Sequence, residues 1–530
     1  MRLLLGMGAT VLSAVLYALA FAPASIRPLA WLALVPFFLA LRTVRGVGPA
    51  LLLGWLWPVA ASSFVADALP AAVEQYFLQP RAVALLFAVG VWTVTGSLYT
   101  MPFALAFRAL ARIPSPWRPL LFAAAWTASE LARGRLMTHT SFFVGNPWAL
   151  LAYSQAGWLE LLQIASLTGV YGVTFVVASV NAGVAELVAA VAARSGARSA
   201  ALGLGLASLP ALGALAFGVT ALRAAGREEV AEAVPIAIVQ GDVSLGSVWR
   251  SDLYGKNLDV YLRLTLEAFT RGDPAIVFWP EAAFTFFLED EPLYRSAIGR
   301  VLAQGSAELV AGGPTRVGGG ESERYRNSVF LIDGDGVVGA RYDKRHLLPF
   351  TEHFPLRSSD FLRRRFERVR VFEHGVATAP LPTRAGPAGV LVCNEAMLPE
   401  LARQRVREGA EYLVSPSNDS WIRYEKWASM MFDLVSLRAV EQRRWLVRAS
   451  TSGPSAVVDP WGRVQVRTAA MTRGVVLGSV HPRRELSLYA RVGDAFGFAC
   501  AAAVALALVA QARTSSDGSA PPLRSLSSRR

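Results

Sequence analysis

Three polar residues of this chain each follow a short apolar run with the composition of a buried strand. Glu281 follows a Trp-Pro pair, Lys344 follows a Tyr-Asp pair, and Cys393 follows a Leu-Val pair. Because the carboxyl ends of strands gather at one edge of an open sheet, these side chains are expected to meet in one cleft. A thiol of pKa about 8.5 is mostly protonated at neutral pH, so it needs a base and a nearby cation. The pattern predicts nucleophilic catalysis, with Cys393 as nucleophile, Glu281 as base and Lys344 as the cation that stabilises an oxyanion.

Each of these residues also has a simpler explanation when it is taken alone. A lone thiol at the end of a strand is usually a small core hydrophobe, Glu281 could lie in a surface turn, and Lys344 could lie in a solvated loop. His346 and His353 are near Lys344 in the sequence, but they are more simply supporting or surface residues. No metal-ligand spacing with Cys393 is evident, so neither a metal nor another cofactor is expected.

The composition indicates an integral membrane protein. Of 530 residues, 53% are hydrophobic and only 17% are charged, which is well below the roughly 25% of an ordinary soluble protein. The formal net charge of +13 could suggest a nucleic-acid partner. No basic stripe with interleaved aromatic residues occurs, however, and much of the positive charge lies in short loops beside apolar segments. The expected acidic partner is therefore a membrane surface and not nucleic acid.

Apolar stretches at both ends of the chain predict a transmembrane bundle of about eight helices. The stretches are residues 3–22, 29–41, 49–69, 82–107, 120–131, 159–191, 200–222 and 492–512. Several approach or exceed the roughly 20 residues that a spanning helix needs, whereas 29–41 and 120–131 are short and could be kinked, tilted or re-entrant. We expect about seven helices in a membrane domain of residues 1–227, one more at 489–512, and a basic, disordered cytoplasmic tail at 513–530.

The arginines predict how the bundle is oriented. With a cytoplasmic N-terminus, the inner segments carry twelve arginines: Arg2, Arg42, Arg45, Arg108, Arg112, Arg118, Arg194, Arg198, Arg513, Arg524, Arg529 and Arg530. The short outer loops carry four: Arg27, Arg81, Arg133 and Arg135. This excess follows the positive-inside rule and places residues 228–488, which come after the seventh helix, on the outer face.

The predicted orientation bears on the thiol. Proteins in an oxidising compartment normally pair their cysteines or avoid them. The only other cysteine, Cys500, lies within the last apolar stretch, where Cys393 could hardly reach it. Cys393 is therefore expected to be a free thiol that is retained for catalysis.

Residues 228–488 alternate between strand and helix patterns. Strand-like runs occur at 234–240, 275–279, 309–313, 327–332, 337–342, 389–392 and 412–415. The Asp-Gly-Asp-Gly sequence at 333–336 is typical of a hairpin turn, and 253–269 and 398–408 have helical patterns. This alternation predicts an α/β domain in which sheets pack against helices.

Three ordered motifs resemble the Glu-Lys-Cys triad of the nitrilase superfamily. They are Trp279-Pro280-Glu281, Tyr342-Asp343-Lys344 with Leu348-Pro349-Phe350-Thr351-Glu352, and Val392-Cys393-Asn394-Glu395. Together with the eight-helix frame and Asn418-Asp419-Ser420-Trp421, they make nearly the whole chain resemble the apolipoprotein N-acyltransferase family. The resemblance implies a nitrilase-like α-β-β-α sandwich at 228–488, the catalytic domain, on the periplasmic face of a multi-pass protein of the cell inner membrane.

The resemblance also implies roles for the motif residues. Glu281 would be the general base, Lys344 the oxyanion stabiliser and Cys393 the nucleophile. Glu352 matches a second glutamate of the family pattern, which orients the lysine and assists proton transfer. The backbone N–H of Asn394 would complete the oxyanion hole.

Two further residues, Trp249 and Glu395, match positions that the family uses near the site. The chain departs from the family at Asn394, where an aromatic residue, commonly Tyr, is usual. It also departs at 422–426, where a Gly- and His-containing run is expected. These departures concern substrate preference and lid behaviour, since a backbone donor at Asn394 survives the change.

The implied reaction is a two-step acyl transfer. Cys393 would attack the sn-1 ester of a phospholipid such as phosphatidylethanolamine, which releases a lysophospholipid and leaves a thioester. The α-amine of the diacylglyceryl-cysteine of an apolipoprotein would then take the acyl chain as an amide, in the last step of lipoprotein maturation. The expected partners are thus a phospholipid donor, a diacylated apolipoprotein acceptor and the membrane, and a monomer is expected.

An arginine cluster is consistent either with contact to anionic lipid headgroups or with a solvated face. It consists of Arg363, Arg364, Arg365, Arg368 and Arg370. Two other functions stay open beside acyl transfer. A membrane-anchored nitrilase-type hydrolase would release the acyl group to water, although a small-amide hydrolase would not need the membrane frame. A non-enzymatic lipoprotein-binding protein would be expected to have an altered triad, and all three members are present here.

Overall fold

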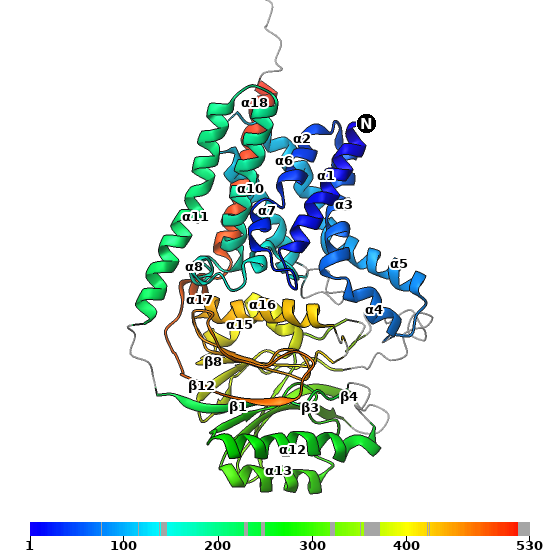
Figure 1. Ribbon diagram of the computed structural model, residues 1–530, viewed down its shortest axis with the longest axis vertical. Coiled ribbons are helices and arrows are strands. Elements are labelled where there is room, and N and C mark those ends of the chain that lie inside the picture. The colour runs from blue at the N-terminus through cyan, green and yellow to red at the C-terminus, as the bar shows by residue number, and fades with distance from the viewer. Residues whose placement is uncertain are drawn as a thin grey trace, which may run out of the picture.

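The chain folds into a helical bundle that stands on a two-sheet α/β domain (Figure 1). The computed structural model describes residues 1–75, 77–114, 116–136, 138, 146–226, 232–244, 250–318, 324–349, 351–353, 372–420, 422 and 424–517. The predicted architecture, a bundle of apolar helices joined to an α/β sandwich, is confirmed.

The bundle is built from the N-terminal helices and the last helix of the chain. They are α1 (Arg2–Leu19), α2 (Val35–Thr43), α3 (Val47–Val65), α4 (Ala68–Gln75), α5 (Arg81–Trp92), α6 (Leu98–Leu110), α7 (Arg118–Arg135), α8 (Leu159–Leu162), α9 (Ala165–Thr168), α10 (Val170–Ala192), α11 (Ala197–Ala225) and α18 (Ala495–Asp517). A π-helical segment, Thr93–Ser97, makes α5 and α6 continuous. Within the described residues, six helices are long and apolar enough to cross a membrane: Arg2–Leu19, Val47–Val65, Arg81–Leu110, Val170–Ala192, Ala197–Ala225 and Ala495–Arg513. They correspond to six of the eight predicted stretches.

The two short apolar stretches have different structures. Residues 29–41 form the end of a 3₁₀ turn, Arg27–Trp31, and most of the nine-residue helix α2. At 1.5 Å per residue, α2 covers about 14 Å, roughly half the hydrocarbon core of a bilayer. Residues 120–131 lie within α7, which has 18 residues and charged residues toward its C-terminal end.

The stretch 159–191 is not one helix. It divides into α8, α9 and α10, and the break before α10 falls at Gly169, whose φ is +67°. A side chain at Gly169 would be strained by this left-handed conformation, and its Cβ would lie 2.4 Å from the ring of Tyr489. Hydropathy alone does not reveal such a break.

Within the described residues, twelve strands form two six-stranded sheets. The first has the order β12-β1-β2-β3-β4-β5, with β1 (Val234–Gln240), β2 (Ile276–Phe278), β3 (Glu308–Val317), β4 (Arg324–Ile332), β5 (Val338–Asp343) and β12 (Gly474–Val480). The second has the order β11-β10-β9-β8-β7-β6, with β6 (Leu381–Thr383), β7 (Gly386–Val390), β8 (Tyr412–Ser417), β9 (Leu446–Ser450), β10 (Ala456–Val458) and β11 (Val464–Arg467). Strands β1, β2 and β3 are parallel, and so are β7, β8 and β9, so each sheet presents a row of carboxyl ends.

Helices cover both outer faces of the paired sheets. Helices α12 (Tyr254–Arg271) and α13 (Pro292–Gly305) lie on the first sheet, on the side away from the bundle (Figure 1). Helices α15 (Pro399–Arg407) and α16 (Glu425–Gln442) lie between the second sheet and the bundle (Figure 1). The layers are therefore helix, sheet, sheet and helix, with the bundle beyond the last layer.

Three buried clusters hold these layers together. Ile238 and Val414 belong to the cluster between the two sheets, and Tyr261 belongs to the cluster under α12 and α13. Leu434 of α16 belongs to the same buried cluster as Tyr153 of the bundle. Because apolar burial continues from the second sheet into the bundle, the α/β domain is packed directly onto the membrane helices.

Candidate active site

The strand ends bring the predicted catalytic residues together. Glu281 follows β2, Lys344 follows β5 and Cys393 follows β7, and all three side chains are buried. Nζ of Lys344 lies 3.5 Å from Oε1 of Glu281, and the charges of both residues shift the pKa of the Cys393 thiol. The predicted meeting of a carboxylate, an ammonium and a thiol in one place is thus present in the structure.

Lys344 lies between two glutamates. Its Nζ is 2.8 Å from Oε2 of Glu352 and donates a hydrogen bond of 3.0 Å to Oε1 of the same residue. Its distance to Oε1 of Glu281 is longer, at 3.5 Å. The amide of Asn327 on β4 donates one hydrogen bond of 2.7 Å to each glutamate. Asn327 therefore fixes the separation of the two carboxylates.

Glu281 is held by both sheets. Its Oε2 accepts a hydrogen bond of 2.7 Å from the backbone N–H of Asn418, which follows β8 of the second sheet. The backbone of Glu281 passes close over β3, where a Cβ on Gly312 would lie 2.6 Å from the Cα of Glu281. Only glycine fits at this crossing. Burial raises the pKa of Glu281 above its usual value, and the charge of Lys344 partly opposes this rise.

The charges of the site favour a neutral thiol and a charged lysine at rest. Burial alone would lower the pKa of Lys344, but the carboxylates of Glu352 and Glu281 outweigh it and raise that pKa. Burial and the charge of Glu281 raise the pKa of the Cys393 thiol well above its usual value, although Lys344 lowers it. The thiol must therefore lose its proton to a base as it reacts. Glu281 is the candidate base, because its carboxylate lies farther from Nζ of Lys344 than that of Glu352 does.

Cys393 has an uncommon backbone conformation. Its φ is +51°, in the left-handed region that a residue with a side chain rarely adopts, and a 3₁₀ turn, Cys393–Met397, begins at it. Such strain persists only where the surroundings impose it, and it is frequent at functional residues. At Cys393 the conformation is imposed by the hydrogen bonds of Glu395, which include one from the backbone N–H of Val392.

Glu395 connects two segments of the site: the cysteine turn, Cys393–Met397, and the lysine loop, which begins at Lys344 after β5. Its Oε2 accepts a hydrogen bond of 2.9 Å from the backbone N–H of Val392. Its Oε1 accepts hydrogen bonds from the backbone N–H groups of Arg345 at 2.9 Å and His346 at 3.1 Å. The hydroxyl of Tyr342 donates to both oxygens. Glu395 is fully buried, so these donors hold its charge and fix Cys393 relative to Lys344.

Asn394 makes a second connection between the same loops. Its side-chain amide donates a hydrogen bond of 3.1 Å to the carbonyl oxygen of His346, and the residue is 2% exposed. The polar side chain that replaces the expected aromatic ring is therefore used inside the protein. His353 is buried, and its ring centroid is 6.0 Å from that of His374.

Some of the features predicted near the site lie outside the described residues. They are Trp249, Trp421, Arg423 in the run that departs from the family pattern, and the arginine cluster at 363–370. Among the residues that the structure does describe, no group of three or more His, Cys, Asp or Glu side chains could hold a metal ion.

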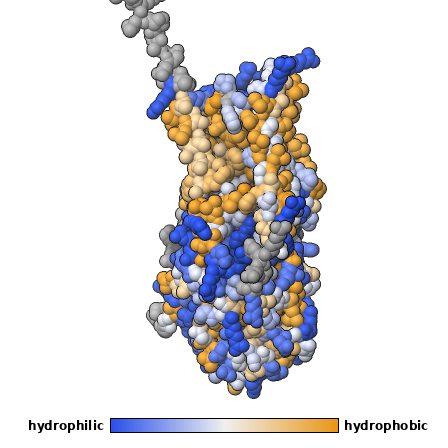
Figure 2. Space-filling view, turned by 90° about the vertical axis from the view of Figure 1, so that its left-hand side faces the viewer, coloured by the Kyte–Doolittle hydropathy of each residue, from blue (hydrophilic) through white to orange (hydrophobic). Residues whose placement is uncertain are grey.

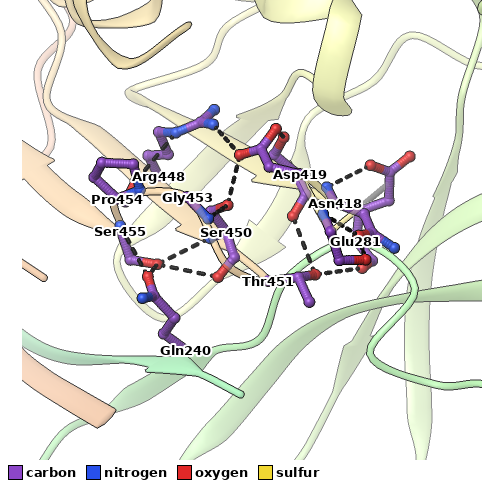
Figure 3. Close-up of polar contacts among 12 residues, drawn as sticks. Gln240, Glu281, Asn418, Asp419, Arg448, Ser450, Thr451, Gly453, Pro454 and Ser455 are labelled. Carbon is purple, nitrogen blue, oxygen red and sulfur yellow. Dashed lines mark hydrogen bonds and ion pairs between the residues drawn. The ribbon is translucent and has the colours of Figure 1, made fainter. Parts of the chain in front are cut away.

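A second polar network supports the Glu281 side of the site (Figure 3). Asp419, next to Asn418, accepts hydrogen bonds of 2.7 Å from Nη2 of Arg448 and from the hydroxyl of Ser450, and all of these side chains are buried. Thr451 donates to the carbonyl oxygen of Glu281 at 3.4 Å. This network keeps the end of β8 in place, so that the N–H of Asn418 points at the carboxylate of Glu281.

Four residues of the site, Asn327, Arg448, Ser450 and Thr451, were not predicted from the sequence. Asn327 lies between Arg326 and Ser328 at the polar start of a strand run, where a further polar residue attracts no notice. Arg448 is a charged residue inside the short strand β9, and it is completely buried. Its role depends on Asp419, which lies 29 residues away along the chain and follows another strand, β8.

Two family models match the chain. Residues 236–485 match the model for carbon-nitrogen hydrolases, and residues 13–183 match the model for the N-terminal domain of apolipoprotein N-acyltransferase. The two matched ranges correspond to the α/β domain and to most of the N-terminal part of the bundle.

Similar proteins cover most of the chain. The apolipoprotein N-acyltransferase of Geobacter metallireducens is 32% identical over 499 residues, which is 94% of this chain and 93% of that protein. The protein of the same name from Pseudomonas aeruginosa is 29% identical over 479 residues, 89% of each chain. Among solved structures, Saccharomyces cerevisiae Nit3, a member of the nitrilase superfamily, is 19% identical with a TM-score of 0.37, over 48% of this chain and 92% of that chain.

Proposed function

Because the chain belongs to the apolipoprotein N-acyltransferase family, we propose that it moves an acyl chain from a phospholipid to the N-terminal amine of diacylated apolipoproteins through a thioester on Cys393. The roles are assigned from the different distances between the two glutamates and Nζ of Lys344. Nζ lies 2.8 Å from Glu352 and 3.5 Å from Glu281. Glu352 is therefore the partner that orients the lysine, and Glu281 is the carboxylate that remains available as a base.

In the first step, Glu281 takes the proton of the Cys393 thiol while the sulfur attacks the ester carbonyl carbon of the phospholipid. The carbonyl oxygen becomes an oxyanion, which the ammonium of Lys344 and the backbone N–H of Asn394 stabilise. The intermediate then collapses to a thioester. The lysophospholipid leaves as an alcohol, with the proton that Glu281 had taken.

In the second step, the amine of the apolipoprotein attacks the thioester carbonyl. Glu281 takes a proton from the attacking nitrogen, and the same two donors hold the oxyanion. Collapse forms the amide, and the proton returns to the departing thiolate of Cys393. Lys344 stays charged in both steps, because its two carboxylate neighbours raise its pKa.

The remaining candidates support these three residues. Glu395 holds the cysteine turn against the lysine loop, and the side chain of Asn394 adds a second hydrogen bond between these two segments. Trp249 remains a proposed neighbour of the site on the strength of the family pattern alone. Neither proposed step requires a cofactor.

The helical bundle favours transfer over hydrolysis. The match of residues 13–183 to the N-terminal domain of the acyltransferase is a feature that a hydrolase of small amides would not need. Retention of Glu281, Lys344 and Cys393 likewise speaks against a scaffold without activity.

We further propose an inner-membrane location with the α/β domain in the periplasm. The N-terminus lies at the end of the bundle that is farthest from the α/β domain (Figure 1). Twelve arginines belong to the segments predicted on that side, against four on the other, which fits a cytoplasmic position for it. The proposed division remains residues 1–227, 228–488, 489–512 and 513–530, although α18 extends beyond 512, to Asp517. The proposed oligomeric state remains a monomer.

The direct test is the intact mass of the purified protein after incubation with phospholipid alone. We expect an adduct of one acyl chain, its absence in Cys393→Ala, and its discharge by a diacylated lipopeptide. An equally fast discharge by water would identify a hydrolase. An adduct of the same size on Cys393→Ala would contradict the nucleophile assignment.

A further inference from the structure

A polar cavity of about 500 Å³ lies where the bundle meets the α/β domain. Arg135 from the end of α7, Arg403 from α15, and Arg345 from the loop after β5 contribute to its lining. His346 and Glu400 line it as well. This cavity is not the space between Glu281, Lys344 and Cys393, since none of these residues lines it.

The charges in this cavity are not balanced. Among the described residues, Arg345 has no carboxylate within ion-pair distance, and its Nη1 donates a hydrogen bond of 3.3 Å to Gln404. Arg403 donates to the backbone carbonyl oxygens of residues 490 and 491, at 3.0 and 2.8 Å. Only Arg135 has acidic partners, Glu400 at 3.3 Å and Asp494 at 3.4 Å. A small anion with several oxygens, such as a phosphate, complements guanidinium groups placed in this way.

The position of the cavity distinguishes a lipid phosphate from a free one. Arg135 is the last residue of α7, and the carbonyl groups bound by Arg403 lie shortly before α18, a candidate membrane span. The cavity thus lies where the bundle meets the α/β domain, close to the start of a candidate span, which is the level expected for the headgroup layer of a bilayer. Figure 2 shows strongly hydrophilic side chains gathered directly below the apolar band of the bundle.

The cavity also adjoins the lysine loop. Arg345 and His346 follow Lys344 directly, and their backbone N–H groups donate to Glu395. The carbonyl group of His346 accepts the hydrogen bond of Asn394. An anion bound to the Arg345 side chain would therefore contact the segment that positions both Lys344 and the cysteine turn.

We propose that this cavity binds the phosphate of a phospholipid headgroup, with Arg345 and Arg403 as its principal donors, while the acyl chains of that lipid stay in the membrane. The inference rests on the proposed function insofar as a phospholipid is the acyl donor. The binding itself requires no turnover, so it is measured separately from acyl transfer.

The test uses the full chain in detergent with Cys393→Ala, so that bound lipid stays intact, and native mass spectrometry counts the lipid retained. The probes are phosphatidylglycerol and a diacylglycerol with the same acyl chains but no phosphate. We expect retention of phosphatidylglycerol alone, and a loss of about tenfold in apparent affinity for Arg345→Gln or Arg403→Gln, as for one charge-assisted hydrogen bond. Arg345→Lys, which keeps the charge, should retain part of the affinity.

The matched control is Arg407→Gln, an exposed arginine of α15 that does not line the cavity. It should bind phosphatidylglycerol as the parent does, and thermal unfolding of all variants would show whether each is folded. Equal retention by Arg345→Gln and Arg403→Gln, or equal retention of diacylglycerol, would overturn the proposal. Displacement of the lipid by millimolar inorganic phosphate would assign the cavity to free phosphate and overturn the lipid assignment. A missing acyl adduct in the protein that keeps Cys393, together with intact lipid binding in Cys393→Ala, would count against the proposed function alone.

Discussion

At the residue scale, the site depends on an ammonium shared unequally by two buried carboxylates. A buried charge without a partner is costly, so Lys344 needs Glu352, and the pair is arranged around the amide of Asn327. Glu281 has hydrogen bonds from two N–H donors and only a long contact with the lysine. The longer contact with Lys344 leaves Glu281 available as the base, whereas the shorter contact makes Glu352 the group that orients the lysine.

Exchange of each glutamate for glutamine tests these roles. Glu281→Gln removes the base and should slow thioester formation by about 10²- to 10⁴-fold at every pH. Glu352→Gln keeps the base but removes the larger support for the charge of Lys344, so the pKa of Lys344 falls and activity is lost preferentially at high pH. Rapid-quench intact mass measurements across pH follow the acyl adduct on Cys393. A larger loss at neutral pH in Glu352→Gln than in Glu281→Gln would reverse the assignment.

Asn327→Ala tests how the pKa of Glu281 is set. Burial raises this pKa, and the hydrogen bond from Asn327 lowers it. Because only the ionised carboxylate accepts the thiol proton, the rate rises with pH through the pKa of Glu281. Removal of Asn327 should raise that pKa further and move the acidic limb of the rate profile to higher pH.

The control for this shift is Asn257→Ala. Asn257 is also a buried asparagine, but its amide donates to the hydroxyl of Thr285 and not to a carboxylate. It should leave the acidic limb unchanged even if it lowers stability. An acidic limb that stays in place in Asn327→Ala would show that the asparagine does not tune the base.

Glu281, Lys344, Cys393, Glu352 and Glu395 could be proposed as site residues from the sequence, because each belongs to a short local motif that resembles the family pattern, and their roles stay predictions. Asn327 and Arg448 have no such motif. Their importance comes from partners on other strands, and a pairing between distant segments leaves no local pattern. For the same reason, the hydrogen bond of Asn394 to the lysine loop could not be foreseen from the missing aromatic ring.

At the element scale, one buried carboxylate connects two loops that come from different sheets. The lysine loop follows β5 of the first sheet, and the cysteine turn follows β7 of the second. Glu395 accepts hydrogen bonds from both, so it connects the segment of the nucleophile directly to the segment of the cation.

Glu395→Gln is expected to loosen this connection. An amide nitrogen cannot accept a hydrogen bond, so at least one of the buried N–H donors loses its partner. The loss should lower the free energy of unfolding by about 1–3 kcal/mol. We expect a lower midpoint of thermal unfolding and a fall in kcat with little change in KM. The control, Glu267→Gln, changes an exposed glutamate that pairs only with Arg271, and it should alter neither. An unchanged kcat in Glu395→Gln would show that the loops are positioned by other contacts.

The elements differ in how far sequence patterns predict them. The strand at 234–240 is found with its predicted bounds, because its run is apolar up to Val239 and ends at a single polar residue, Gln240. Helix α16 was not predicted. It is buried against the second sheet on one side and the bundle on the other, so it lacks the polar face that marks a surface helix. The strand β11 was missed because it is short and mostly exposed.

At the scale of the whole molecule, the bundle and the α/β domain share buried charges as well as an apolar core. Arg438 and Glu441 of α16 are completely buried, and Nε of Arg438 lies 3.2 Å from Oε2 of Glu441. Glu441 accepts a hydrogen bond of 2.9 Å from the backbone N–H of Val170, where α10 begins. Arg438 donates to the hydroxyl of Tyr153, also in the bundle, at 3.1 Å. These contacts fix the height of the site above the membrane helices, and therefore the reach of a lipid toward Cys393.

A double-mutant experiment can test the buried ion pair between Arg438 and Glu441. Arg438→Met should destabilise the protein by about 3–5 kcal/mol, because it leaves the charge of Glu441 buried without its partner. Replacement of both residues by methionine should recover much of that loss, since a buried ion pair is often no more stable than apolar side chains of similar volume. Thermal unfolding in detergent measures the stability, and acyl transfer to a lipopeptide measures the alignment of the two parts. If the pair mainly aligns the domains, the double variant will be stable but slow. A double variant as unstable as Arg438→Met would instead show that the hydrogen bonds to Tyr153 and Val170 provide the stability, with the ion pair secondary.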